Sequence, residues 1–174
     1  GRNTLLIRKR KIMSREESVK LYNTYARKLF NISFRILHDS GEAEEIMQDT
    51  ILKYITTGPK FLSEVQTAAW LSKTCIRKSI DVLRKKKREK LFLEEYEVEV
   101  EDAAVDAKPG DLSIGNIRKA ISELPEASRL VLTLILLEGL DYEEVANYTG
   151  AREGTIRVQY SRARAKLAEK LRSM

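Results

Sequence analysis

The chain has 174 residues, 43% of them hydrophobic and 33% charged, which is typical of a globular protein with a substantial core. Its net charge of +6 and its pI near 9.4 favour a polyanion as a partner. No apolar run is long enough to span a membrane, and the apolar segment 5–7 is too short for a signal peptide, so we expect a cytoplasmic protein.

Residues 1–13 are basic and lack helical periodicity, which predicts a mobile N-terminal arm. Ser14, followed by Glu16 and Glu17, marks the start of a helix that should run to about residue 37. Its inward face should hold residues spaced by three and four: Val19, Tyr22, Ala26, Leu29, Ser33 and Ile36. Residues 38–41 are predicted to form a turn. The only histidine lies in that turn and has no second histidine with which to bind a metal.

A second helix is predicted over residues 42–55, with one buried stripe. The stripe comprises Ala43, Ile46, Met47, Thr50, Ile51 and Tyr54. Glu45 and Asp49 are four residues apart and therefore share the outer face. A metal would need further ligands close by, and none is predictable. The outer face is either a partner surface or a plain solvated face, and the residues alone do not separate the two.

Gly58 and Pro59 mark a loop over residues 56–65, and a third helix is predicted from about residue 66 to residue 88. Trp70, Leu71, Cys75, Ser79 and Leu83 should face inward, and the single cysteine cannot form an intrachain disulfide. The outer side is basic: Lys73, Arg77, Lys78, Arg84, Lys85, Lys86, Lys87 and Arg88. Such a run either complements the helix dipole or binds phosphates, and we favour phosphates.

The sign of the charge reverses over residues 91–111, which we interpret as an acidic linker between two helical domains, 14–90 and 112–174. In the second domain, a helix is predicted over residues 112–124, with Ile114, Ile117, Ala120, Ile121 and Leu124 inward. Pro125 starts the next helix, whose Leu130, Val131, Leu134, Ile135 and Leu137 should form the core.

Residues 141–171 are typical of a helix-turn-helix motif. Asp141 and Glu144 can form a capping box, and Gly150 ends the first helix. The second helix should pack through Ile156, Tyr160, Ala163, Leu167 and Leu171. On or beside its outer side stand Arg152, Thr155, Arg157, Val158, Ser161, Arg162 and Arg164. We predict that this side enters a DNA major groove, and the alternative is a helical hairpin with a solvated basic face.

Three segments, in this order along the chain, resemble the sigma-70 family of bacterial sigma factors. EAEEIMQDTILKYI (42–55) is similar to the second conserved-region helix, and AAWLSKTCIRKSIDVLRKKKR (68–88) to the promoter-melting helix that follows it. Residues 121–167 are similar to region 4. The small two-domain form with an acidic linker resembles the extracytoplasmic-function class. The chain shows no Gly-rich phosphate loop, no Cys or His cluster and no Ser–His–Asp arrangement, so neither an enzyme nor a cofactor is expected.

The resemblance implies a role for each surface. The 42–55 helix would dock on the clamp helices of the largest subunit of core RNA polymerase through Glu45, Gln48, Asp49 and Lys53. The segment 56–65 would hold a flipped base of the −10 element, and the basic third helix would contact the melted strand. The recognition helix would read the −35 element through Thr155, Arg157, Val158 and Arg162. The acidic linker would lie in the polymerase channel that later carries RNA.

We therefore expect an all-α, two-domain sigma factor whose partners are core RNA polymerase, promoter DNA and an anti-sigma factor. Arg77 departs from the family, whose members often have Asn there, but Arg can bind phosphate or stack on a base. One rival is a sigma mimic that sequesters an anti-sigma factor, and the two basic helical faces argue against it. The other is a dimeric helix-turn-helix regulator, for which no spare apolar stripe is visible.

Overall fold

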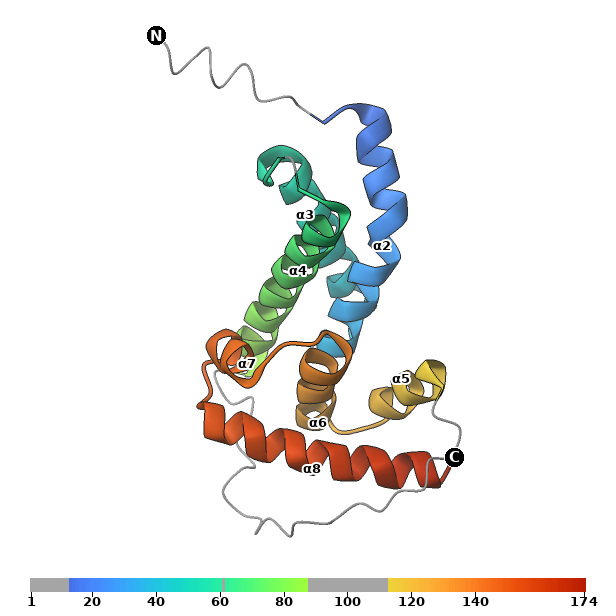
Figure 1. The fold of residues 1–174 in the computed structure, drawn as a ribbon, viewed down its shortest axis with the longest axis vertical. Coiled ribbons are helices and arrows are strands. Elements are labelled where there is room, and N and C mark those ends of the chain that lie inside the picture. The colour runs from blue at the N-terminus through green and yellow to red at the C-terminus, as the bar shows by residue number, and fades with distance from the viewer. Residues whose placement is uncertain (1–12, 61, 88–112) are drawn as a thin grey trace. The chain divides into compact units, whose positions relative to one another are not determined.

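The computed structural model describes residues 13–60, 62–87 and 113–174, and every element in these ranges is helical, which confirms the predicted all-α class (Figure 1). Contacts group the chain into two compact units, one of residues up to 34 with 38–78 and the other of residues 35–37 with 79–174. None of the described helices combines the length and the apolarity needed to cross a membrane. The predicted linker 91–111 and nearly all of the arm 1–13 lie outside the described residues, so the domain limits remain predictions.

The first helices of the chain are α2 (Arg15–Leu37), α3 (Ser40–Thr57) and α4 (Glu64–Lys87). As predicted, Ser14 caps α2, and its hydroxyl accepts a hydrogen bond of 3.1 Å from the Glu17 N–H. α3 begins two residues earlier than predicted, because Asp39 is the N-cap and accepts 3.0 Å from the Glu42 N–H. Ser40 and Gly41 are therefore helical rather than part of a turn.

α4 also begins two residues earlier than predicted, and a capping box explains the difference. The Gln66 N–H donates to the Ser63 hydroxyl over 3.2 Å, while the Ser63 N–H donates to Gln66 Oε1 over 2.9 Å. The sequence signal for this box, a serine followed three residues later by a glutamine, was present. Its two hydrogen bonds fix the start of the helix at Glu64.

The cores of α3 and α4 agree with the predicted stripes except at Tyr54 and Trp70, which are half-buried. Ala43, Ile46, Met47, Thr50 and Ile51 are buried on α3, and Leu71, Cys75, Ser79 and Leu83 are buried on α4. The Cys75 thiol donates to the Leu29 carbonyl of α2 over 3.4 Å, which places it among the buried groups, as predicted.

The predicted inward face of α2 is wrong at its N-terminal end. Val19 and Tyr22 are 51% and 42% exposed, whereas Leu21 and Ile32 are buried. At about 100° per residue, Tyr22 lies only about 20° from Leu29 around the helix, so spacing alone does not account for its exposure. The repeat therefore does not predict which side chains of the first turns are buried.

The later helices are α5 (Ile114–Ser122), α6 (Glu126–Val131), the π-helical segment η2 (Leu132–Leu137), α7 (Tyr142–Thr149) and α8 (Glu153–Arg172). α5, α6 and α7 all contact α8, the longest of them (Figure 1). Ala120, Ile121, Leu124, Leu130, Val131, Leu132 and Leu134 are buried. Ile114 was predicted to face inward, but it precedes this core by nearly two turns and is 55% exposed.

The sequence did not signal the π-helical segment. The Glu138 N–H donates to the Thr133 carbonyl over 3.0 Å, a hydrogen bond that spans five residues instead of four. The wider turn changes which side chains face the core, so Leu132 and Thr133 are buried while Ile135 and Leu137 are only half-buried.

Candidate nucleic-acid interface

α7 and α8 form the predicted helix-turn-helix. The Asp141 carboxylate accepts 2.8 Å from the Glu144 N–H, and Glu144 Oε1 accepts 3.4 Å from the Asp141 N–H, which confirms the capping box. Gly150 ends α7 with φ 75°, a left-handed conformation that costs glycine little. α8 then begins at Glu153, with Arg152 as its N-cap.

The buried face of α8 differs from the prediction at Tyr160 and at Leu171, which is half-buried. Ile156, Ala163 and Leu167 are buried as expected, but Gln159 takes the place that we assigned to Tyr160. Tyr160 is only half-buried and lies at the edge of this face. An apolar pattern favours a tyrosine over a glutamine, so sequence reasoning missed the exchange.

The predicted outer side of α8 divides into two flanks. Arg152, Arg157 and Arg164 are exposed, and Thr155, Val158, Ser161 and Arg162 are half-buried. Arg157 and Arg162 are five residues apart, which places them about 140° from one another at about 100° per residue. The two arginines that we predicted to read bases therefore cannot make equivalent contacts with a DNA groove.

The flank that carries Arg157 is held by a chain of side-chain contacts. Arg157 donates 3.0 Å to Glu153 Oε1, and its guanidinium lies 4.7 Å from the centre of the Tyr142 ring. Tyr142 meets Tyr160 edge to face, with the ring centres 6.0 Å apart. Arg164 in turn lies 4.9 Å from the Tyr160 ring centre. Burial raises the pKa of the Tyr160 hydroxyl, while the positive charge of Arg164 acts in the opposite direction.

The basic side of α4 is a different kind of surface. Lys73, Arg77, Lys85, Lys86 and Lys87 are exposed, Lys78 and Arg84 are half-buried, and Arg88 lies outside the described residues. Apolar and small side chains on the opposite side of the helix are buried, as predicted. Lys73, Arg77 and Arg84 lie within about 40° of one another around the helix, at about 100° per residue, whereas Lys85, Lys86 and Lys87 spread around its last turn.

A hollow of about 470 Å³ lies where α3 ends and the chain turns towards α4. It is lined by Thr56, Thr57, Gly58, Pro59, Lys60 and Trp70. Tyr54 contacts Trp70 edge to face with ring centres 5.4 Å apart, and its hydroxyl lies 3.3 Å from the Thr67 hydroxyl. We predicted that Trp70 faces inward, but it is half-buried and forms part of this hollow.

Gly58 is required by the close approach of Tyr54. A Cβ atom at position 58 would lie 2.5 Å from the Tyr54 carbonyl oxygen and 2.8 Å from its Cα. These are backbone atoms, so they cannot rotate away as a flexible side chain could. The tight turn brings residues 56–60 onto the same hollow as the indole.

The outward side of α3 carries every residue predicted to bind core polymerase. Glu45, Gln48, Asp49 and Lys53 are all exposed. Leu52 is exposed among them, with 58% of its surface accessible, and sequence reasoning did not single it out. Its spacing of three and four residues from Asp49 and Gln48 was the available signal. The surface therefore offers charged groups around one apolar side chain.

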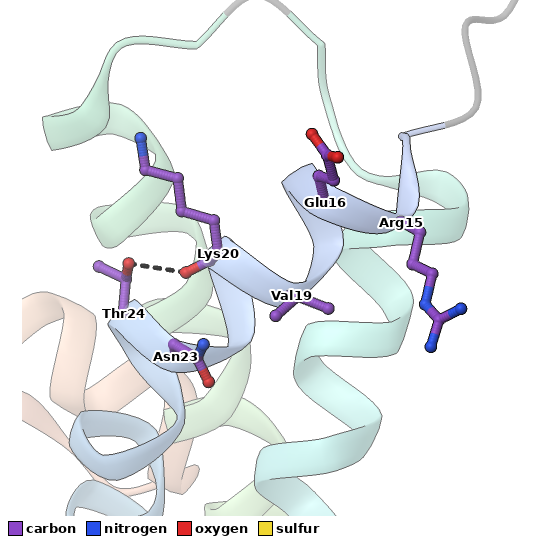
Figure 2. Close-up of a pocket in the computed structure, with 6 residues that line it drawn as sticks. All are labelled: Arg15, Glu16, Val19, Lys20, Asn23 and Thr24. Atoms are coloured by element: carbon purple, nitrogen blue, oxygen red, sulfur yellow. Dashed lines mark hydrogen bonds between the residues drawn. The ribbon is translucent and has the colours of Figure 1, made fainter.

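A second, open hollow of about 560 Å³ follows the first turns of α2 (Figure 2). It is lined by Arg15, Glu16, Val19, Lys20, Asn23 and Thr24. The Thr24 hydroxyl donates 2.7 Å to the Lys20 carbonyl, so it is engaged by its own helix. Within residues 13–60, 62–87 and 113–174, no group of His, Cys, Asp or Glu is arranged to hold a metal ion.

Family models match both ends of this architecture. The model described as sigma-70 region 2 matches residues 21–89, and the model described as sigma-70, region 4 matches residues 114–167. Together they cover more than two thirds of the chain. The first match contains α3 and α4, and the second contains the helix-turn-helix.

Curated relatives of the chain are named as RNA polymerase sigma factors. The chain is 24% identical to the ECF RNA polymerase sigma factor SigE of Mycolicibacterium smegmatis over 87% of its own length and 60% of the relative's. It is 24% identical to the RNA polymerase sigma factor SigV of Bacillus subtilis, over 77% of the chain and 78% of the relative. It is 29% identical to the ECF RNA polymerase sigma factor SigF of Caulobacter vibrioides, over 76% and 72%.

A solved structure has a similar fold. It is the sigma factor RpoE of Bartonella quintana, crystallised in complex with the anti-sigma factor NepR. The two chains superpose with a TM-score of 0.51 and are 28% identical, over 87% of this chain and 94% of the other.

Proposed function

The chain belongs to the sigma-70 family of RNA polymerase sigma factors, in its extracytoplasmic-function class, and on this premise we propose that it directs core RNA polymerase to promoters with −35 and −10 elements. The observation that carries the proposal is that one chain presents a charged docking surface on α3 and basic surfaces on both α4 and α8. RNA synthesis itself would be catalysed by the polymerase, and we propose no enzymatic activity for the chain.

We propose that α3 docks on the clamp helices of core polymerase. Glu45 and Asp49 would pair with basic groups, and Leu52 would supply the apolar centre of the contact. Interface centres are depleted of charge relative to their rims, and an exposed leucine among charged residues fits that pattern.

The −10 element would be bound by the hollow beside Trp70 and by the basic residues of α4. The hollow beside Trp70 has space for a base that has left the stack, and an aromatic side chain there can stack on it. Such stacking contributes about 1–3 kcal/mol per base. The outward lysines of α4 would then hold the phosphates of the melted strand.

The −35 element would be read by α8 in the major groove. Arginine can bind the O6 and N7 atoms of guanine with two hydrogen bonds, and either Arg157 or Arg162 is our candidate for this contact. Arg152 and Arg164 would bind phosphates and position the helix. The protein would act in the cytoplasm and be held inactive by an anti-sigma factor, in line with the complex of the solved relative.

The direct test is transcription in vitro with purified core polymerase on a library of genomic promoter fragments. The unmodified chain should give discrete start sites that core polymerase alone does not give. Replacing both Glu45 and Asp49 with lysine should abolish co-elution with core polymerase and transcription, while the neutral pair Glu45→Gln and Asp49→Asn should reduce both partly. Glu169→Lys, an exposed charge reversal on α8, is the control for co-elution and should leave it unchanged.

Two results would contradict the proposal in different ways. An unmodified chain that binds core polymerase but starts no transcription would not be a working sigma factor. A chain that binds an anti-sigma factor but neither core polymerase nor promoter would be a sigma mimic instead.

A further inference from the structure

We propose that Glu153 is a specificity-determining residue of the −35 contact, because it holds Arg157, together with Tyr142, in one orientation for reading a base pair. The inference rests on the proposed function, since it concerns the DNA contact of α8. It adds an acidic residue, Glu153, to a DNA contact for which only basic and neutral residues of α8 were predicted.

The guanidinium of Arg157 is restrained from two directions. One end donates 3.0 Å to Glu153 Oε1, one turn earlier on the same helix. Its central carbon, Cζ, lies 4.7 Å from the centre of the Tyr142 ring, which belongs to α7. The hydrogen bond and the ring contact together restrict the orientation of the group more than either contact could alone.

The platform under the guanidinium is itself held. Tyr142 is the first residue of α7, directly after the Asp141 capping box, so its backbone is fixed by the cap. Its ring is braced edge to face by Tyr160 of α8, at 6.0 Å between centres. The orientation of Arg157 therefore depends on the packing of both helices of the motif.

The chemistry of guanine recognition explains why such restraint matters. An arginine carries five N–H donors in a rigid fork, and a bidentate guanine contact uses two of them in one plane. The bond to Glu153 engages one end of the fork and leaves donors on the other sides for a base. An arginine already held in this way loses less conformational entropy on binding than one that must first be ordered.

The carboxylate also acts against the wrong contacts. Glu153 lies in the first turn of α8, beside the surface that would approach DNA, and its negative charge repels phosphates. Removing it should therefore strengthen binding to all sequences while weakening the preference for one base pair. Both effects lower the ratio of specific to non-specific binding, which is the quantity that matters for promoter choice.

The fold itself depends little on this ion pair. The side chains of Arg157 and Glu153 are 60% and 48% exposed, and exposed pairs four residues apart contribute little to stability. A change at Glu153 can thus be tested without unfolding the motif. Arg162, on the opposite flank of α8, provides an internal reference that the change should not affect.

The test uses the complete chain with core polymerase and a promoter library randomised in the −35 element. The variants are Glu153→Ala, Glu153→Gln, Arg157→Ala and the double variant Glu153→Ala with Arg157→Ala. Glu169→Ala removes the same charge near the other end of α8 and serves as the matched control.

Arg157→Ala should lose the preference at one base pair by a factor of about 5 or more. Glu153→Ala should lose much of the preference at that same position, and it should not change the preference further when Arg157 is already alanine. Glu153→Gln keeps an acceptor oxygen and should retain part of the preference. Thermal melting of each variant checks that the helix-turn-helix is folded, and Glu169→Ala should match the unmodified chain throughout.

The outcomes separate this inference from the proposed function. If the unmodified chain supports no transcription, the proposed function fails. If it does, but Glu153→Ala raises activity on all sequences equally and leaves the preference unaltered, Glu153 only masks Arg157 and the inference is overturned. An unaltered preference in Arg157→Ala would overturn it as well, because there would be no reading by Arg157 to position.

Discussion

The basic sides of α4 and α8 present positive charge in different forms. Between residues 73 and 87, α4 carries five lysines and two arginines, and five of these seven side chains are exposed. Between residues 153 and 164, α8 carries three arginines and no lysine, and the guanidinium groups of two of them lie against tyrosine rings. A lysine is a mobile point charge, whereas an arginine is a planar fork that a ring and a carboxylate can orient.

The difference separates anchoring from reading. Phosphates are the same at every position, so a group of lysines binds them without regard to sequence. Base edges differ, and reading them needs donors in a fixed plane. On the α4 side we assign sequence preference to the hollow beside Trp70 and not to the charges.

The largest effect is expected from closing the hollow on the α4 side. Gly58→Ala would place a Cβ 2.5 Å from the Tyr54 carbonyl oxygen, so the turn must shift. We expect a loss of about 1–3 kcal/mol in the free energy of unfolding, as for other overpacked sites. The loss of activity should depend on the −10 sequence, so it should differ among promoters that vary only in the −10 element. Denaturant unfolding and transcription on −10 variants measure the two effects.

Gly41→Ala is the matched control for that change. It lies in the first turn of α3, the helix that Gly58 caps at its other end, and its Cβ would make only an ordinary contact of 3.4 Å with Asp39 Oδ1. Alanine at a compatible helical position should keep or raise stability, by up to about 1 kcal/mol. Equal losses in the two variants would show that the close approach at Gly58 is not the cause.

The next effect sharpens the difference between fork and point charge. Arg157→Lys keeps the charge but loses the planar fork, so it should cost about 1–3 kcal/mol of discrimination at one base pair of the −35 element. The reverse exchange on α4, Lys85→Arg, should leave the sequence preference unchanged. Selection from a −35 library measures the first variant and selection from a −10 library the second. A preference that survives Arg157→Lys would mean that α8 contributes charge alone.

Removing charge from α4 should have a smaller effect that is independent of sequence. In Lys85→Gln with Lys86→Gln, two phosphate contacts are lost, and the slope of log affinity against log salt should fall by about 0.7–0.9 for each. The measurement is a salt titration of promoter binding by the assembled polymerase. An altered base preference with an unchanged slope would contradict the phosphate assignment.

How far the sequence alone could predict this molecule depends on how local each determinant is. The caps at Ser14 and Asp141 and the turn at Gly150 depend on neighbouring residues, and all were predicted correctly. The earlier start of α4 was also a local signal, since Ser63 and Gln66 form a capping box that the sequence displays. Local hydrogen bonds decide where a helix begins, so these features are readable from residues close in the chain.

Faces of helices were harder to predict, because tertiary packing decides them. Gln159 and Tyr160 lie at similar angles on either side of the Ile156–Ala163–Leu167 stripe, so periodicity does not choose between them. The structure buries the glutamine, because the tyrosine packs sideways against Tyr142 of α7. Likewise, nothing local in residues 132–137 announces a π-helical turn.

In the candidate site, too, contacts within one helix could be predicted from the sequence and contacts between helices could not. The spacing of four between Glu153 and Arg157 is a sequence signal for an ion pair, with the acid on the favourable N-terminal side. The contact of Arg157 with Tyr142 joins two helices and could not be read from spacing. Leu52 was passed over because an apolar residue outside the buried stripe gives no sign of what covers it.

The smallest effect concerns the tyrosine that braces the α8 flank. Burial raises the pKa of Tyr160 above its model-compound value of 10.0, so the folded chain favours the neutral hydroxyl. This contribution to stability is complete below pH 10 and is lost as the pH rises through the folded pKa. Tyr160→Phe should reduce the fall in unfolding free energy above pH 10. An identical alkaline profile in the variant would exclude Tyr160 as its source.

The division between anchoring and reading is tested most directly by one selection experiment at two salt concentrations. Polymerase assembled with the unmodified chain, with Arg157→Lys, or with Lys85→Gln and Lys86→Gln would select promoters from a library randomised in the −35 element. We predict that Arg157→Lys changes the selected sequence and leaves the salt dependence almost unaltered, whereas the α4 variant lowers the salt dependence and selects the same sequence. If both variants change the same quantity, the two helices do not divide the work of recognition and the account is contradicted.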